Sequence, residues 1–224
     1  MEEMASSKPT VFVVDDEPDA RDSVAALSLS LGLDCQVYAS AEAFLREYPR
    51  DAPGCLVTDI RMLGMNGLEL IRALPEHNIT LPVIAISGYA DTKLAVEIMR
   101  HGAVTMLEKP CRREELVEAI RGAIARDAQQ RAAREEQADF VAKLEALSAS
   151  ERAVLDGMMA GKPNKAIARE LDVSIRTVES RRAQVFAKLG CQTVAEIVRK
   201  ATHAGYEMAG QSSSAISSSP SKGE

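Results

Sequence analysis

The chain has 224 residues, of which 46% are hydrophobic and 27% charged, and a formal net charge of -6 at pH 7. This composition is typical of soluble globular proteins, and the length fits two domains of ordinary size. No apolar run approaches the roughly 20 residues of a membrane span, and the first residues lack the basic and apolar regions of a secretory signal. We therefore expect a cytoplasmic protein that does not enter membranes.

The cysteine spacing argues against two kinds of site, and the charge distribution bears on the partners of the chain. The four cysteines, Cys35, Cys55, Cys111 and Cys191, form no CxxC pair, which argues against a zinc site or a disulfide framework. Acidic residues outnumber basic ones over residues 1–143, whereas basic residues are in slight excess over 144–210. This asymmetry indicates that the two halves of the chain have different partners.

From Pro9 to about Ala125, short β-branched or apolar runs alternate with helical patterns, which predicts a parallel sheet wrapped by helices. The expected strands are Val11–Val14, Cys35–Tyr38, Cys55–Thr58, Val83–Ile86 and Thr105–Leu107. The expected helices are Ala20–Leu31, Ala41–Tyr48, Gly67–Leu74, Thr92–Arg100 and a helix from Glu114 onward. Five such units predict an α/β flavodoxin-like domain with strand order 2-1-3-4-5 and ligands at the carboxyl ends of the strands.

Chemically active side chains follow four of the five strands. Asp15 and Asp16 come after the first strand, Asp59 after the third, Ser87 after the fourth and Lys109 after the fifth. Strands 1 and 3 are neighbours in the predicted order, so the three carboxylates converge on one pocket that Ser87 and Lys109 border. Three carboxylates suit a hard cation such as Mg²⁺, and Lys109 adds a fixed positive charge.

The motifs "VDDEPDAR", "DIRMLGMNGLEL", "ISGYAD" and "LEKP" resemble the receiver domain of two-component response regulators, over residues 9–125. The resemblance implies that Asp59 accepts a phosphoryl group from a phosphohistidine on a sensor histidine kinase. It implies that Asp16, Asp59 and the backbone carbonyl of Arg61 bind Mg²⁺ directly and that Asp15 binds it through water. Beyond its own phosphorylation and dephosphorylation, such a domain is not an enzyme.

The chemistry of the pocket agrees with this resemblance. A carboxylate is a suitable nucleophile for forming an aspartyl phosphate, and Mg²⁺ and Lys109 would neutralise the transferred group. The Ser87 hydroxyl would then hydrogen-bond the phosphoryl group and act as a switch together with Met106. The family pattern usually has proline at Leu63, an acidic residue at Asn66, an aromatic residue at Met106 and phenylalanine at Cys111.

From Arg112 to about Leu147 the sequence has no proline and much alanine, glutamate, arginine and glutamine, which predicts one long helix. Residues 126–146 are expected to form a helical linker. A solvated spacer is favoured over a dimeric coiled coil, because sustained apolar heptads are missing.

Helix-capping residues mark a second domain at 147–210. Ser148 and Glu151 form an S-x-x-E capping box, and Asn164 and Ser174 are expected to cap the next two helices. Gly190 should end the third helix, and a last helix should run near Val194–His203. The tight turn between the second and third helices predicts a small all-α helix-turn-helix domain, followed by a serine-rich, disordered tail at 211–224.

The third helix of this domain carries a polar face suited to a DNA major groove. Val178, Val185 and Leu189 recur at helical spacing and face the core. The DNA-binding candidates are Asn164, Lys165, Arg176, Thr177, Ser180, Arg181, Arg182, Gln184 and Lys188.

The stretches "LSASERAVL", "NKAIARELDVSIRTVESRRAQVFAKLG" and "AEIV" resemble the LuxR-type DNA-binding domain. Arg181 stands where many relatives have histidine, and Glu179 where many have lysine. With the receiver, the whole chain resembles the FixJ/NarL group of response regulators. The resemblance implies a transcription regulator that binds double-stranded DNA and forms a homodimer when phosphorylated.

Two alternatives stay open at this point. The first is a DNA-binding regulator controlled by protein contacts without phosphorylation, motivated by Met106, Leu63 and Cys111. The second is a phosphatase or phosphotransferase that uses Asp59 as nucleophile, although Arg61 stands where an acidic general acid would be expected.

Overall fold

The computed structural model describes residues 8–88 and 92–206. Internal contacts divide the chain into two compact units, residues 1–132 and residues 133–224. The tail predicted to be disordered, 211–224, lies outside the described residues. Among the described residues, no helix is both long enough and apolar enough to cross a membrane.

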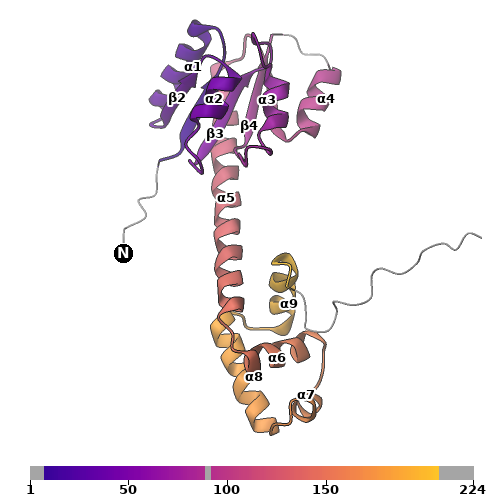
Figure 1. Cartoon of the computed structure of the whole chain (residues 1–224). Helices are drawn as coiled ribbons and strands as arrows, with labels where there is room; N and C mark the ends of the chain where they lie inside the picture. Colours follow the sequence, from indigo (N-terminus) through magenta and orange to yellow (C-terminus); the bar gives the residue numbers. More distant parts are fainter. Residues whose placement is uncertain (1–7, 89–91, 207–224) are drawn as a thin grey trace, which may run out of the picture. The chain divides into compact units, whose positions relative to one another are not determined.

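The first unit is built on a parallel sheet of five strands in the predicted order, β2-β1-β3-β4-β5 (Figure 1). The strands are β1 (Thr10–Val14), β2 (Asp34–Tyr38), β3 (Gly54–Asp59), β4 (Val83–Ser87) and β5 (Ala103–Glu108). The central strands β1, β3 and β4 are buried along their whole length, because helices cover both faces of the sheet. The predicted α/β fold with this strand order is therefore confirmed.

Helices alternate with these strands along the chain, as predicted. They are α1 (Pro18–Ser30), α2 (Ala41–Glu47), α3 (Gly67–Ala73), α4 (Thr92–Arg100) and α5 (Arg113–Glu145). All five helices begin within two residues of the predicted positions.

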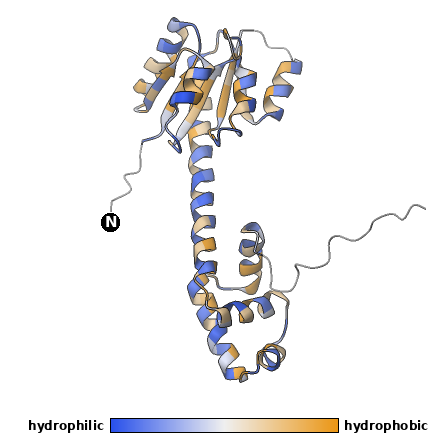
Figure 2. Cartoon of the chain, viewed as in Figure 1, coloured by the Kyte–Doolittle hydropathy of each residue, from blue (hydrophilic) through white to orange (hydrophobic). Residues whose placement is uncertain are grey.

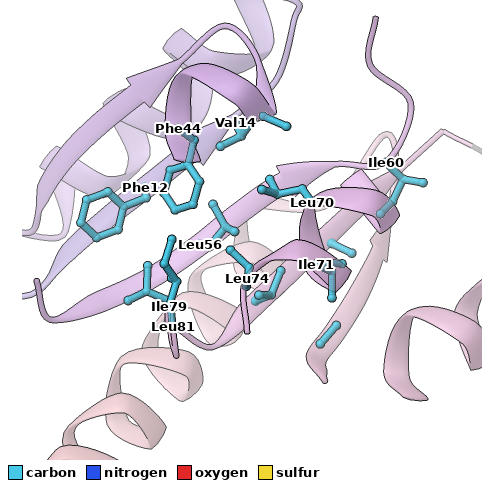
Figure 3. Close-up of a cluster of buried hydrophobic side chains, with 14 of the residues drawn as sticks. Phe12, Val14, Phe44, Leu56, Ile60, Leu70, Ile71, Leu74, Ile79 and Leu81 are labelled. Carbon is cyan, nitrogen blue, oxygen red and sulfur yellow. The ribbon is translucent and has the colours of Figure 1, made fainter. Parts of the chain in front are cut away.

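Two separate hydrophobic clusters fill the space between sheet and helices, because alternate residues of a strand face opposite sides. On one side Phe12 and Leu56 pack against Phe44 of α2 and Leu70 of α3 (Figure 3). On the other side the main residues are Val11, Val13, Cys55, Val57, Ile84 and Ile86 of the sheet, Val24 and Leu27 of α1, and Leu116, Ile120 and Ala123 of α5.

Helix α5 continues past its apolar part, and its residues Asp127 and Arg131 hydrogen-bond the backbone at the start of β3 and just before it. The buried Asp127 carboxylate accepts hydrogen bonds from the Gly54 amide at 2.9 Å and from Arg131 Nε at 2.7 Å. The two amino groups of Arg131 donate to the backbone carbonyls of Asp51 and Ala52, both at 2.7 Å. The first turns of the predicted linker thus belong to the first unit.

The second unit consists of the end of α5 and four shorter helices, α6 (Ala149–Met159), α7 (Asn164–Glu170), α8 (Ile175–Leu189) and α9 (Val194–His203). Phe140 and Leu144 of α5 enter its hydrophobic core with Val154, Val178 and Val185. Figure 2 shows that most of the middle of α5 is hydrophilic. The end of the predicted linker is therefore part of this core.

The predicted caps are confirmed with one exception. Ser148 and Glu151 form a reciprocal capping box, Ser174 caps α8, and Gly190 ends it with a left-handed φ of 65°. The prediction that Asn164 caps α7 is wrong, because Asn164 is already helical. The carbonyl of Pro163 accepts hydrogen bonds from the amides of Ala166 and Ile167, at 2.9 and 3.2 Å. Pro163 is therefore the N-cap, and α7 begins at Asn164, one residue earlier than predicted.

We predict that Asp127→Ala lowers the free energy of unfolding of the first unit by about 3 kcal/mol, because it leaves Arg131 and the Gly54 amide without their acceptor. Asp139→Ala on the same helix breaks an exposed pair with Lys143 and should cost less than about 0.5 kcal/mol. Urea unfolding followed by circular dichroism measures both. Equal losses for the two variants would contradict this role of Asp127.

Candidate functional site

The five side chains predicted to converge lie at the carboxyl edge of the sheet. Asp59 is the last residue of β3 and Ser87 the last of β4, while Asp15 and Lys109 directly follow β1 and β5. β1 pairs with β3, β3 with β4 and β4 with β5, which brings these strand ends side by side. Asp16 follows Asp15 at the same edge.

The Lys109 ammonium bridges two carboxylates. Its Nζ lies 2.9 Å from Asp15 Oδ2 and 2.9 Å from Asp59 Oδ1. Asp15 is 5% exposed and Asp59 6%, so both carboxylates are largely shielded from water. Burial disfavours the charged lysine, but the hydrogen bonds and charges of Asp59 and Asp15 outweigh this effect and raise the pKa of Lys109. The two carboxylates therefore favour the charged form of Lys109 beside Asp59.

Backbone amides hold the remaining oxygens of these two carboxylates. Asp15 Oδ1 accepts the Glu17 amide at 2.9 Å, and Asp59 Oδ2 accepts the Arg61 amide at 2.8 Å. Because both oxygens of each carboxylate are engaged, the side chains of Asp15 and Asp59 are fixed in orientation.

Helix α3 starts directly against the backbone of Asp59, and this requires glycine. An ideal Cβ at Gly67 would lie 2.1 Å from the Asp59 carbonyl oxygen. The Gly67 amide donates to the Ile60 carbonyl at 3.1 Å. A larger residue at this position would push α3 away from Asp59.

The two switch candidates lie on neighbouring strands. Ser87 is fully buried at the end of β4. Met106 of β5 pairs in register with Ala85 of β4 and packs, partly buried, against the cluster that contains Phe12. Met106 therefore occupies the same side of the sheet as α2 and α3.

The donor set suits a hard divalent cation, although the described residues hold no preformed cluster of three or more His, Cys, Asp or Glu in metal-binding arrangement. Asp15, Asp16 and Asp59 offer only carboxylate oxygens, the ligands that Mg²⁺ prefers. Asp16 is half-buried and stands outside the Lys109 bridge. The residues fit Mg²⁺ by their chemistry.

The loop after Asp59, residues 60–66, is held by carboxylates through its backbone. The Leu63 amide donates to Asp16 Oδ2 at 3.0 Å, and the Met65 amide donates to Glu42 Oε1 of α2 at 2.9 Å. The bond from Met65 is the main reason that the pKa of Glu42 lies below its ordinary value. The sequence analysis missed Glu42, since an acceptor for a backbone amide leaves no sequence pattern.

In the second unit, α8 presents one exposed face that is mostly polar. Val178, Val185 and Leu189 are buried on its other side, as predicted. The exposed residues are Ile175, Arg176, Glu179, Ser180, Ala183, Gln184, Ala187 and Lys188. Arg176, Ser180 and Gln184, which were predicted to contact DNA, therefore point away from the core.

The other DNA-binding candidates are more constrained. Arg181 and Arg182 are half-buried, and Thr177 Oγ1 lies 2.8 Å from the capping hydroxyl of Ser174. Lys188 pairs with the buried Glu151 of α6 at 2.7 Å, so this lysine fastens α8 to α6.

The remaining two candidates stand at the start of α7. Lys165 is exposed and Asn164 half-buried. Both lie in the first turn of α7, the helix that precedes α8 in the helix-turn-helix arrangement.

Two family models match the chain. The response regulator receiver domain matches residues 11–121, and the LuxR family of bacterial regulatory proteins matches residues 145–201. These matches correspond to the two compact units.

Relatives and solved structures span both units. The chain is 42% identical to the transcriptional regulatory protein FixJ of Rhizobium meliloti, over 88% of this chain and 97% of the relative. The structure of the response regulator StyR matches with a TM-score of 0.75 and 34% identity, over 88% of this chain and all of StyR. Full-length FixJ from B. japonicum matches with a TM-score of 0.54 and 38% identity, over 88% and 98% of the two chains.

We predict that the stability of the second unit depends on the ionised Glu151. The hydrogen bond from Lys188, helped by Ser148, lowers the pKa of Glu151 to about 2. Because the pKa of Glu151 is lower in the folded state, its ionised side chain stabilises the fold at pH values above about 4.5. This stabilisation is lost as the pH falls from about 4.5 to about 2. Thermal unfolding over this range should show a smaller pH dependence for Glu151→Gln than for the native chain.

Glu170→Gln is the matched control, because Glu170 forms an exposed pair with Lys162. The thermal unfolding of Glu170→Gln should depend on pH in the same way as that of the native chain. Parallel curves for the native chain and Glu151→Gln would rule out this role of Glu151.

Proposed function

Because the chain belongs to the two-component response regulators of the FixJ/NarL type, we propose that phosphorylation of Asp59 by a sensor histidine kinase controls its binding to DNA. A receiver domain implies a histidine kinase as partner, and a LuxR-type domain implies DNA. This family consists of transcription regulators that are not enzymes. The observation that supports the proposal most directly is the Lys109 bridge between Asp15 and Asp59.

Asp59 is the proposed nucleophile. One of its carboxylate oxygens forms a bond to phosphorus while the bond between phosphorus and the donor histidine nitrogen breaks, and the nitrogen keeps the electron pair. Lys109 at Oδ1 and the Arg61 amide at Oδ2 orient the carboxylate before the reaction. Lys109 then lies beside the added negative charge and stabilises it.

Asp16, Asp59 and the backbone carbonyl of Arg61 are the proposed direct Mg²⁺ ligands, and Asp15 is proposed to bind the cation through water. When bound, the cation supplies further positive charge for the oxygens of the transferred group. Asp15 and Asp59 are already fixed in orientation by Lys109 and the Glu17 and Arg61 amides.

The proposed output begins at Ser87. A phosphoryl group adds a charge of about -1.5 to -2 at Asp59, and the Ser87 hydroxyl on the neighbouring strand is a suitable hydrogen-bond donor to it. Movement of Ser87 and of the packing around Met106 would alter the surface of β4 and β5. A homodimer formed through such a change would bind palindromic DNA with two copies of α8.

We predict that the native chain gains the mass of one phosphoryl group when incubated with Mg²⁺ and acetyl phosphate, because Asp59 is held for attack. Asp59→Ala should gain none. Asp51→Ala, which removes an exposed aspartate beyond the other end of the sheet, should gain as much as the native chain. Intact-mass spectrometry measures all three, and an equal adduct on Asp59→Ala would exclude Asp59 as acceptor.

We predict that Arg176→Ala weakens DNA binding tenfold or more, because Arg176 is exposed at the first turn of α8, where side chains reach base edges. Arg100→Ala on α4 removes the same charge from the receiver and should change affinity less than twofold. Titration of a fragment enriched from random DNA, at one fixed salt concentration, gives both values. Equal effects of the two variants would refute a specific contact by Arg176.

A further inference from the structure

Glu179 is the only acidic residue of α8, and it lies on the exposed face of that helix. The residues one turn before and one turn after it, Ile175 and Ala183, are exposed as well. Val178 and Val185 are fully buried and mark the other side of the helix. The Glu179 carboxylate therefore belongs to the same surface as Arg176, Ser180 and Gln184, which are proposed to contact DNA.

The structure gives this carboxylate no role in folding. In the part of the chain that the structure describes, no hydrogen bond or ion pair engages the Glu179 side chain. By contrast, Glu151, Glu170 and Glu196 of the neighbouring helices each pair with a lysine. Glu179 is therefore an accessible hydrogen-bond acceptor that can bind a group outside the protein.

A lone carboxylate on a DNA-binding face is unfavourable unless it meets a hydrogen-bond donor. Phosphates repel it, and contacts to phosphates supply most of the affinity for DNA of any sequence. In the major groove the base donors are the N4 amino group of cytosine and the N6 amino group of adenine. Adenine also presents the acceptor N7, which repels a carboxylate oxygen, so cytosine is the better partner for glutamate.

The surroundings of Glu179 allow the helix to approach the bases closely. Three exposed residues of the same face, Ser180, Ala183 and Ala187, have short side chains. Glu179 also lies in the first half of α8, and the N-terminal part of a recognition helix is the part that contacts base edges. A glutamate side chain at this position is thus suited to reach a base in the groove.

We propose that Glu179 is a specificity-determining residue, which accepts a hydrogen bond from the N4 amino group of a cytosine in the major groove. The inference rests on the proposed function, because it takes α8 as the helix that enters the groove. It goes further in assigning one base pair to one side chain. If Glu179 were only a solvated charge, its removal would tighten binding to every DNA sequence, because a repulsive charge is lost.

The first experiment selects binding sites from random DNA with the full chain, incubated with Mg²⁺ and acetyl phosphate. The sites selected by the native chain should share a C·G pair for which Glu179→Ala has no preference. Glu179→Gln should prefer an A·T pair at that place, because a carboxamide matches both N6 and N7 of adenine. The control is Glu170→Gln, which alters an exposed acid of α7 and should select the same sites as the native chain.

The second experiment measures the affinity of each protein for the selected fragment and for the same fragment with the C·G pair replaced by T·A. For the native chain the replacement should weaken binding about fivefold or more. For Glu179→Ala it should change binding less than about twofold, because the two changes remove the same contact. All titrations use one salt concentration, and circular dichroism checks that the variants are folded.

The possible results separate this inference from the proposed function. Identical selected sites for the native chain and Glu179→Ala would refute base reading by Glu179 and leave DNA binding by α8 intact. Tighter binding of Glu179→Ala to both fragments would show that Glu179 only repels phosphates. A lost preference for A·T in place of C·G would contradict the assignment of cytosine. If the native chain selects no sequence, the proposed sequence-specific DNA binding is refuted, and the inference with it.

Discussion

One ammonium group holds the acidic edge of the sheet together. Asp15 and Asp59 are almost fully buried and close enough for Lys109 to contact both at 2.9 Å, so without a counter-charge their repulsion and desolvation would oppose folding. The strand order places the ends of β1 and β3 side by side. Lys109 follows β5, which is separated from β3 by β4. A phosphoryl group on Asp59 would add negative charge at the point where the Lys109 ammonium pairs with both carboxylates.

The sequence predicted the features that depend on local pattern. Apolar runs located the strands, and capping residues such as Ser148 and Ser174 located the helix starts. It did not predict contacts between distant residues that no pattern marks. The Asp127 bond to Gly54 spans 73 positions, and the pairing of Lys188 with Glu151 depends on how α8 packs against α6. Lys188 consequently has a structural partner in addition to its predicted DNA contact.

The polar groups fall into two classes that correspond to different roles. Asp127 and Glu151 are buried acids whose oxygens accept bonds from neighbouring cations and from nearby amide or hydroxyl groups, which stabilise each unit. Among the described residues, the Asp16 carboxylate accepts one hydrogen bond, at Oδ2, and Arg176, Ser180 and Gln184 on α8 are exposed. Groups that are left accessible in this way are the ones suited to bind a cation or DNA.

The central claim is that the charge state of Asp59 changes the affinity of the second unit for DNA. The most direct test is to titrate one DNA fragment with the unmodified and the phosphorylated native chain, at a single salt concentration because phosphate contacts are salt-sensitive. Tighter binding by the phosphorylated chain is the result that the proposed mechanism predicts. Equal affinity of the two forms would contradict it and would favour a regulator whose DNA binding is independent of phosphorylation.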